Sequence, residues 1–173
     1  MIRVVSFDLY NCLVDLRLDE KIWVKLKSDW TSVFDEVKDN AITYVFDDVR
    51  RVLPALKRKY ALAVFTAENK EYATHKLQIV HLSSHVSRVI STQEFGDKSK
   101  TAESFVWLMK QLNVEPSEMI HVGDDRRFDY ALPRQVGIRS FLLDRTGFEQ
   151  GPDVVRSLVD VETELALQRP TNG

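Results

Sequence analysis

Residues 119–143 read MIHVGDDRRFDYALPRQVGIRSFLL, and this stretch decides the fold. A short apolar run at 119–122 predicts a buried strand, which ends at the polar triplet Gly123-Asp124-Asp125. A short helix is predicted over 129–136 and a second strand over 139–143. A strand, an acidic loop, a helix and another strand are typical of the repeating unit of a parallel sheet.

The rest of the chain repeats this alternation. Further short apolar runs, each typical of a buried strand, lie at 2–7, 61–65 and 86–90. Helices are predicted between and after them at 47–59, 68–82, 101–112 and 152–167. The sequence therefore predicts an α/β, three-layer Rossmann-like fold: a parallel sheet of five or six strands with helices on both faces.

Composition excludes several classes of protein. The 173 residues are 44% apolar, enough for one domain with a substantial core. The 24 basic and 26 acidic residues nearly balance, which argues against a dedicated nucleic-acid binder. A single cysteine excludes an internal disulfide. No apolar run approaches the ~20 residues of a membrane span, and an acid at position 8 argues against a signal peptide, so we expect a soluble, cytoplasmic protein.

The stretch 13–44 is the one irregularity in this pattern. It contains one predicted amphipathic helix, at 20–38, and no convincing strand. We interpret it as a reduced insertion or linker helix within a single domain spanning 1–167, followed by a flexible tail at 168–173. Its aromatic stripe, Trp23, Trp30 and Phe34, fits core packing or a homodimer face.

Polar residues follow the predicted strands at the points where those strands end. Asp8 follows the first strand, Thr66 the second, and Asp124 follows the strand at 119–122, with Asp129 shortly after it. Each acid alone could be an ordinary turn or cap residue. Because the carboxyl ends of parallel strands share one edge of a sheet, we expect these residues to converge there, together with a lysine from the loop at 98–100.

These motifs, in this order and spacing, resemble those of the haloacid dehalogenase-like (HAD) hydrolase superfamily. Its first motif, a strand followed by Asp-x-Asp-x-Thr, corresponds to VVSFDLYNCLVD, and its second, a strand ending in Ser or Thr, to ALAVFT. The third motif, a lysine before a helix, corresponds to FGDKSKTAESF, and the fourth to IHVGDDRRFD. The resemblance covers most of the chain outside 13–44 and implies a small-cap or cap-less member.

The resemblance assigns roles to individual residues. It implies that Asp8 is the nucleophile and that Mg²⁺ is held by Asp8, the backbone carbonyl of Tyr10 and Asp124, with Asp129 orienting a metal-bound water. Thr66 would donate a hydrogen bond to a phosphoryl oxygen, and Ala67, Lys98 and Lys100 would complete the binding of the phosphorylated substrate, which could be a small molecule or a macromolecule. Between the two lysines we prefer Lys98 for the charge-neutralising role, because it lies closer to the strand end.

Two positions depart from the phosphatase pattern. Tyr10 replaces the aspartate that protonates the leaving group, and a phenol with an ordinary pKa of about 10 is a poor base at neutral pH. Tyrosine also occupies this place in the 2-haloacid dehalogenases, whose halide leaving group needs no proton. Cys12 replaces the threonine and is interpreted as a small buried residue.

The function is therefore weighed among three alternatives. A Mg²⁺-dependent phosphatase or phosphotransferase is favoured, because Gly123-Asp124 and Asp129 are retained and the dehalogenases work without metal. A metal-free dehalogenase and a degenerate, non-catalytic phosphate-binding protein remain open. His81 and His85 could share a helix face as zinc ligands, although a loop fits them equally well, and His121 is interpreted as a core histidine.

Overall fold

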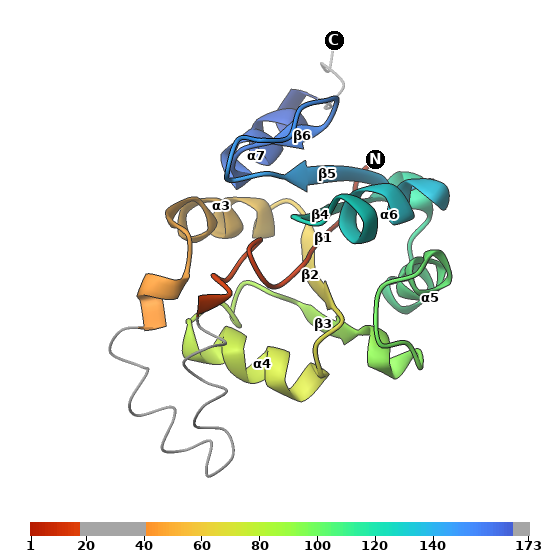
Figure 1. The fold of residues 1–173 in the computed structure, drawn as a ribbon, viewed down its shortest axis with the longest axis horizontal. Helices are drawn as coiled ribbons and strands as arrows, with labels where there is room; N and C mark the ends of the chain where they lie inside the picture. Colours follow the sequence, from red (N-terminus) through yellow and green to blue (C-terminus); the bar gives the residue numbers. More distant parts are fainter. Residues whose placement is uncertain (18–40, 168–173) are drawn as a thin grey trace.

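The computed structural model describes residues 1–17 and 41–167, and in these ranges six strands form one parallel sheet (Figure 1). The order of the strands across the sheet is β3-β2-β1-β4-β5-β6. The strands are β1 (Val4–Phe7), β2 (Ala61–Thr66), β3 (Arg88–Ser91), β4 (Met119–Gly123), β5 (Arg139–Leu143) and β6 (Val154–Val155). The predicted parallel sheet of five or six strands is confirmed.

Helices cover both faces of the sheet, which makes the three predicted layers. One face packs against α3 (Asp47–Lys57), α4 (Lys70–Ile79) and α7 (Leu158–Leu167), and the other against α5 (Ala102–Leu112) and α6 (Leu132–Gln135). Successive side chains of a strand point to opposite faces, so Val5 and Phe7 of β1 join the first core and Val4 joins the second. Short helical turns lie at η1 (Ala41–Tyr44), η2 (Thr92–Glu94), η3 (Pro116–Glu118) and η4 (Arg126–Ala131).

The register of the central strands brings their carboxyl ends level. Phe7 of β1 lies opposite Val64 of β2 and Val122 of β4. The backbone N–H of Asp8 continues the ladder by donating to the carbonyl of Val122 at 2.8 Å. The residues that follow β1, β2 and β4 therefore emerge together at one edge of the sheet, as predicted from their positions after the apolar runs.

The C-terminal prediction is wrong in part, because residues 152–157 are not helical. Asp153 adopts a left-handed backbone with φ +57°, and Val154–Val155 then pairs with β5 as the edge strand β6. The helix begins only at Leu158, after the backbone N–H groups of Arg156 and Ser157 have donated to the Asp160 carboxylate. Two consecutive β-branched residues favour the sheet edge over the first turn of a helix.

The helix predicted over 129–136 has a different start and form. It begins at Arg126 as the π-helical turn η4 and continues as α6. Asp125 caps this turn, since its side chain accepts hydrogen bonds from the backbone N–H groups of Arg127 and Phe128. The wide turn carries Asp129 on its inner side, where the residue is buried.

The helix predicted at 20–38, its aromatic stripe and the tail at 168–173 lie outside the described residues. Among the helices in the described ranges, none is both long and apolar enough to cross a membrane.

Candidate active site

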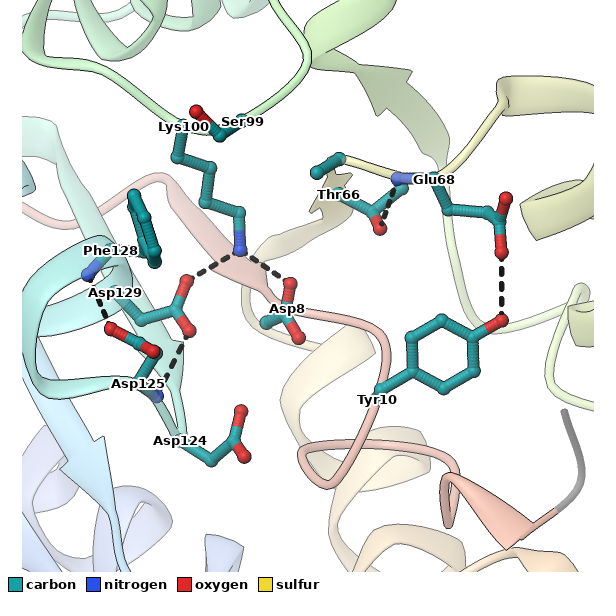
Figure 2. Close-up of a pocket in the computed structure, with 11 residues that line it drawn as sticks. Asp8, Tyr10, Thr66, Glu68, Ser99, Lys100, Asp124, Asp125, Phe128 and Asp129 are labelled. Atoms are coloured by element: carbon teal, nitrogen blue, oxygen red, sulfur yellow. Dashed lines mark hydrogen bonds and ion pairs between the residues drawn. The ribbon is translucent and has the colours of Figure 1, made fainter. Parts of the chain in front are cut away.

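A cavity of about 360 Å³ opens at the carboxyl edge of the sheet, where the predicted site residues meet (Figure 2). It lies over the ends of β1, β2 and β4 and is closed on one side by the loop before α5. The lining residues are Asp8, Tyr10, Thr66, Ala67, Glu68, Ser99, Lys100, Asp124, Asp125, Phe128 and Asp129. Thr66 and Ala67, expected at the substrate, therefore line the same cavity as Asp8.

Lys100 is the lysine that reaches the site, so the sequence-based preference for Lys98 is wrong. The Lys100 ammonium forms ion pairs with the carboxylates of Asp8 and Asp129, and only 4% of its side chain is exposed. Lys98 is exposed and is not among the residues that line the cavity. Lys100 immediately precedes Thr101, the N-cap of α5, so the start of that helix and not the distance from the strand end decides which lysine turns inward.

Burial and the neighbouring charges shift the pKa values of the three carboxyl groups in this cluster. Burial raises the pKa of Asp8 to about 7, with Lys100 opposing the rise and Asp129 and Asp124 adding to it. The pKa of Asp124 is also raised, chiefly by burial. Burial acts on Asp129 in the same direction, but Lys100 and His121 outweigh it and hold the pKa of Asp129 well below its usual range. Asp129 is therefore the firmly ionised member of the cluster.

The three carboxylates also fit a divalent cation. One oxygen from each of Asp8, Asp124 and Asp129 lies within 4.8 Å of the others. Two oxygens bound directly to one Mg²⁺ at ~2.1 Å lie at most about 4.2 Å apart, so a small side-chain movement, or a water between Asp129 and the ion, brings all three into range. Three carboxylates face the single ammonium of Lys100, and a divalent cation would balance the remaining charge.

Gly123 leaves room for the Asp129 carboxylate. A Cβ atom at position 123 would overlap the carboxyl carbon of Asp129, so any larger residue there would displace this acid. Asp124, the next residue, is held from the other side, where the Asn11 side-chain amide donates to it at 3.0 Å. In the Gly-Asp pair, Gly123 therefore leaves the space that Asp129 occupies, and the second residue is itself the acid Asp124.

Thr66 lies at the end of β2 and is buried. Its hydroxyl oxygen accepts a hydrogen bond from the backbone N–H of Glu68 at 3.1 Å, which leaves the hydroxyl hydrogen to be donated elsewhere. The arrangement suits a donor to an anionic group in the cavity.

The Tyr10 side chain turns away from Asp8 and towards two residues that the sequence reading missed. Its hydroxyl donates to Glu68 at 2.9 Å (Figure 2). It also contacts the ammonium of Lys76 in α4. Lys76 is 1% exposed and pairs with Glu68 at 2.7 Å. A lysine among the buried residues Ala73 and Leu77 on one helix face was the signal for this cluster.

The remaining candidates behave as small structural groups. Cys12 is buried, as expected, and its thiol donates to the carbonyl of Val122. His81 and His85 do not share a helix, because α4 ends at Ile79 and His81 lies in the following turn with φ +60°. His121 is buried, as expected, but it contacts Asp129, so it is more than a packing residue.

Comparison with known proteins agrees with this geometry. The sequence model of the family described as "Haloacid dehalogenase-like hydrolase" matches residues 7–143. The chain belongs to this family. A curated relative of the HAD chain, the phosphoglycolate phosphatase of Vibrio vulnificus (strain YJ016), is 23% identical over 157 residues, which cover 88% of this chain and 68% of the relative.

Solved structures share the fold of this HAD protein. The HAD-hydrolase YfnB from Bacillus subtilis, bound to magnesium, matches with a TM-score of 0.76 at 11% identity, covering 95% of this chain and 99% of that one. The L-2-haloacid dehalogenase from Xanthobacter autotrophicus matches with a TM-score of 0.74 at 15% identity, covering 98% and 100%. At these identities the likeness establishes the architecture alone.

Proposed function

We propose that this HAD protein is a Mg²⁺-dependent phosphatase or phosphotransferase that acts through an aspartyl-phosphate on Asp8. The observation that carries the proposal is the cluster of Asp8, Asp124 and Asp129 around one buried lysine. Dehalogenation by this family does not need such a set of acids, whereas the approach of a phosphate dianion to a carboxylate does need a cation.

In the proposed reaction an Asp8 oxygen attacks phosphorus and the bond from phosphorus to the leaving oxygen breaks. Bound Mg²⁺ would supply positive charge against the phosphate and would be held by Asp8, the Tyr10 carbonyl and Asp124, with Asp129 behind them. Lys100 opposes the rise in the Asp8 pKa, which favours the ionised nucleophile, and it would balance charge on the transferring group, to which Thr66 would donate a hydrogen bond. Water, or an acceptor alcohol in a phosphotransferase, then takes the phosphoryl group from Asp8.

Dehalogenation is the second candidate, and Tyr10 is the observation that favours it. The Tyr10 hydroxyl is directed at Glu68 and Lys76, so the side chain at position 10 supplies no carboxylic acid as a proton donor. A halide leaves without a proton, and an activated phosphate ester nearly so. Under either candidate function, we therefore expect the site to act on substrates whose leaving groups depart without a proton.

One panel of assays separates the candidates. Phosphate release is measured from p-nitrophenyl phosphate, an acyl phosphate and phosphoglycolate, with Mg²⁺ and with a chelator, beside halide release from 2-chloropropionate. We expect Mg²⁺-dependent phosphate release that is lost in Asp8→Asn, and Mg²⁺ binding by calorimetry that is lost in Asp124→Ala. Metal-independent halide release would establish the dehalogenase, and inactivity throughout would favour a degenerate phosphate-binding protein.

A further inference from the structure

His121 is a buried polar side chain that the proposed reaction does not use. It lies in the middle of β4, in a run of otherwise apolar residues, and is fully buried. An imidazole in such a place is costly unless its nitrogens find partners, and an aliphatic side chain would fill the same space without that cost. Its contacts therefore indicate what it does there.

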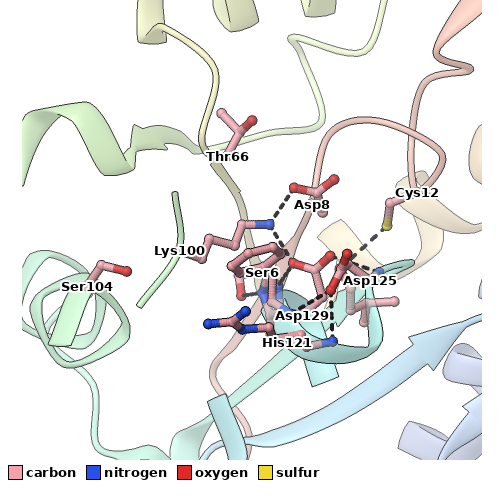
Figure 3. A network of polar contacts seen from close by, with 12 residues as sticks. Ser6, Asp8, Cys12, Thr66, Lys100, Ser104, His121, Asp125 and Asp129 are labelled. Atoms are coloured by element: carbon pink, nitrogen blue, oxygen red, sulfur yellow. Dashed lines mark hydrogen bonds and ion pairs between the residues drawn. The ribbon is translucent and has the colours of Figure 1, made fainter. Parts of the chain in front are cut away.

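Both ring nitrogens of His121 have polar partners (Figure 3). Nε2 lies 3.0 Å from Asp129 Oδ1, and Nδ1 lies 2.7 Å from the hydroxyl oxygen of Ser6 in β1. Because an ionised carboxylate only accepts, Nε2 must carry the hydrogen. In the neutral ring Nδ1 then accepts from Ser6, which sets the tautomer and ties β4 to β1.

Packing holds the ring in this orientation. The ring of Phe105 in α5 meets that of His121 at a centroid distance of 5.0 Å and an angle of 75°, and Phe65 in β2 meets it at 6.4 Å and 77°. Both are edge-to-face contacts, from the helix layer and from the neighbouring part of the sheet. Rotation of the ring would break these contacts together with both hydrogen bonds.

Asp129 is the group that this arrangement fixes. Its Oδ1 accepts from both His121 and Lys100, and its Oδ2 accepts from the backbone N–H of Asp125 at 3.2 Å. A carboxylate has about four acceptor positions, so these three donors, one from β4 and two from loops, leave one. The carboxylate cannot turn without losing at least one of them.

We propose that His121, supported by Ser6, is a positioning residue that locks the Asp129 carboxylate in the orientation needed to hold Mg²⁺ with Asp8 and Asp124. This inference rests on the proposed function. Partners behind a metal-holding group typically change metal affinity or activity by about 10–100-fold when they are removed. A histidine serves here because it reaches Asp129 from within the core while its far nitrogen is anchored on the neighbouring strand.

Two matched variants test the contact to Asp129. In His121→Gln the amide nitrogen can take the place of Nε2, whereas the shorter side chain of His121→Asn reaches only the Ser6 side. We expect calorimetric Mg²⁺ affinity to fall about 10–100-fold in His121→Asn and to stay within about threefold of wild type in His121→Gln, with thermal unfolding confirming that both are folded. Equal affinity of wild type and His121→Asn would overturn the proposal.

A second measurement uses the wild-type protein, so it does not depend on whether a variant folds, and it requires no metal. Nitrogen chemical shifts of the His121 ring, in the presence of a chelator, report which nitrogen carries a hydrogen. Protonation at Nε2 supports the proposal, and a ring protonated only at Nδ1 overturns it. If wild type shows this Nε2 signature but binds no Mg²⁺, the proposed metal-dependent function fails. The positioning role is then judged separately, by whether the Asp129 carboxylate changes its orientation in metal-free crystals of His121→Asn.

Discussion

At the scale of single residues, the pair Lys98 and Lys100 offers a sharp comparison. They are two positions apart, yet one is exposed and the other forms ion pairs with Asp8 and Asp129. We predict that Lys100→Met lowers kcat for p-nitrophenyl phosphate by about 10²–10³-fold, because a buried charge that offsets the developing negative charge is removed. Lys98→Met is the matched control and should keep wild-type kcat. A comparable loss in both variants would show that the loop, and not the Lys100 ammonium, matters.

If the proposed function holds, we expect Tyr10 to determine which leaving groups are accepted. Alkyl phosphates need a proton as their alkoxide departs, and a positioned acid is worth about 10²–10⁴-fold. We predict that wild type turns over p-nitrophenyl and acyl phosphates but few alkyl phosphates, and that Tyr10→Asp raises turnover of the alkyl phosphates selectively.

Tyr10→Phe is the control for that substitution, since it removes the bond to Glu68 without adding an acid. It should not improve alkyl phosphates, and unfolding curves for both variants separate lost packing from lost chemistry. Brisk alkyl phosphate hydrolysis by wild type, with no gain in Tyr10→Asp, would mean that another group supplies the proton.

The residues at the site differ in how far the sequence could reveal them. Asp8, Thr66, Asp124 and Asp129 follow strands or their loops, and strand ends can be read from apolar runs. The choice between two lysines depends on which side of a helix start faces inward, which spacing along the chain does not encode. Lys76 and Glu68 meet Tyr10 only through tertiary contacts.

At the scale of elements, the turn η4 carries the site's most firmly ionised acid. Asp125 caps η4 through the backbone N–H groups of Arg127 and Phe128, and its own N–H donates to Asp129. We predict that Asp125→Ala lowers the free energy of unfolding by about 1 kcal/mol, with a fall in Tm of roughly 2–4 °C, because two backbone donors lose their acceptor. Urea and thermal denaturation measure this change.

Asp125→Asn is the conservative partner of that variant, since its side-chain oxygen can still accept, and it should remain within about 0.5 kcal/mol of wild type. Because Asp129 keeps the Asp125 backbone N–H in both variants, Mg²⁺ affinity should change less than in Asp124→Ala. A loss of affinity as large as that of Asp124→Ala would instead assign Asp125 to the metal.

Among the elements, the residue pattern predicts the buried strands well and the edge strand poorly. Buried strands β1, β2 and β4 are short, mostly apolar runs, with Ser6 inside β1 and His121 inside β4, and the predicted ends lie close to the observed ones. The sequence predicts helix for the two-residue edge strand β6, because 152–167 has a helix-compatible composition and Val154–Val155 becomes a strand only by pairing with β5. A short edge strand depends on its partner more than on its own residues.

At the scale of the whole molecule, the fold buries the Lys100 ammonium together with the carboxylates of Asp8 and Asp129. Asp8 has a pKa of about 7 against an ordinary value of 3.8, so folding favours its neutral form. The homodimer suggested by the aromatic stripe of 20–38 involves residues outside the described ranges and stays a prediction.

The metal-free protein should lose stability as pH rises from about 4 to about 7. Below pH 4 Asp8 is protonated in both the folded and the unfolded chain, and above pH 7 it is ionised in both, so the loss falls between the two pKa values. Asp124, whose pKa is also raised, adds to the same trend. Asp129 acts oppositely, since its folded pKa is lowered, but its contribution is lost only as pH falls below about 4 and so leaves this window unaffected.

We therefore predict that, in a chelator, the free energy of unfolding of wild type falls between pH 5 and pH 8 by an amount on the order of 2 kcal/mol relative to Asp8→Asn. This is below the ~4 kcal/mol that three pKa units correspond to, because the titration begins near the ordinary pKa of 3.8 and the part below pH 5 lies outside the measured window. Saturating Mg²⁺ should reverse the trend, adding about 2.7 kcal/mol at 100 times its Kd at pH 8 and less at pH 5, where protons compete for Asp8. Urea denaturation of both proteins at each pH, with chelator and with Mg²⁺, measures all of these terms. If the difference between wild type and Asp8→Asn is the same at pH 5 and pH 8, Asp8 titrates at its ordinary pKa, and the cluster does not hold the unbalanced charge that makes it a site for a divalent cation.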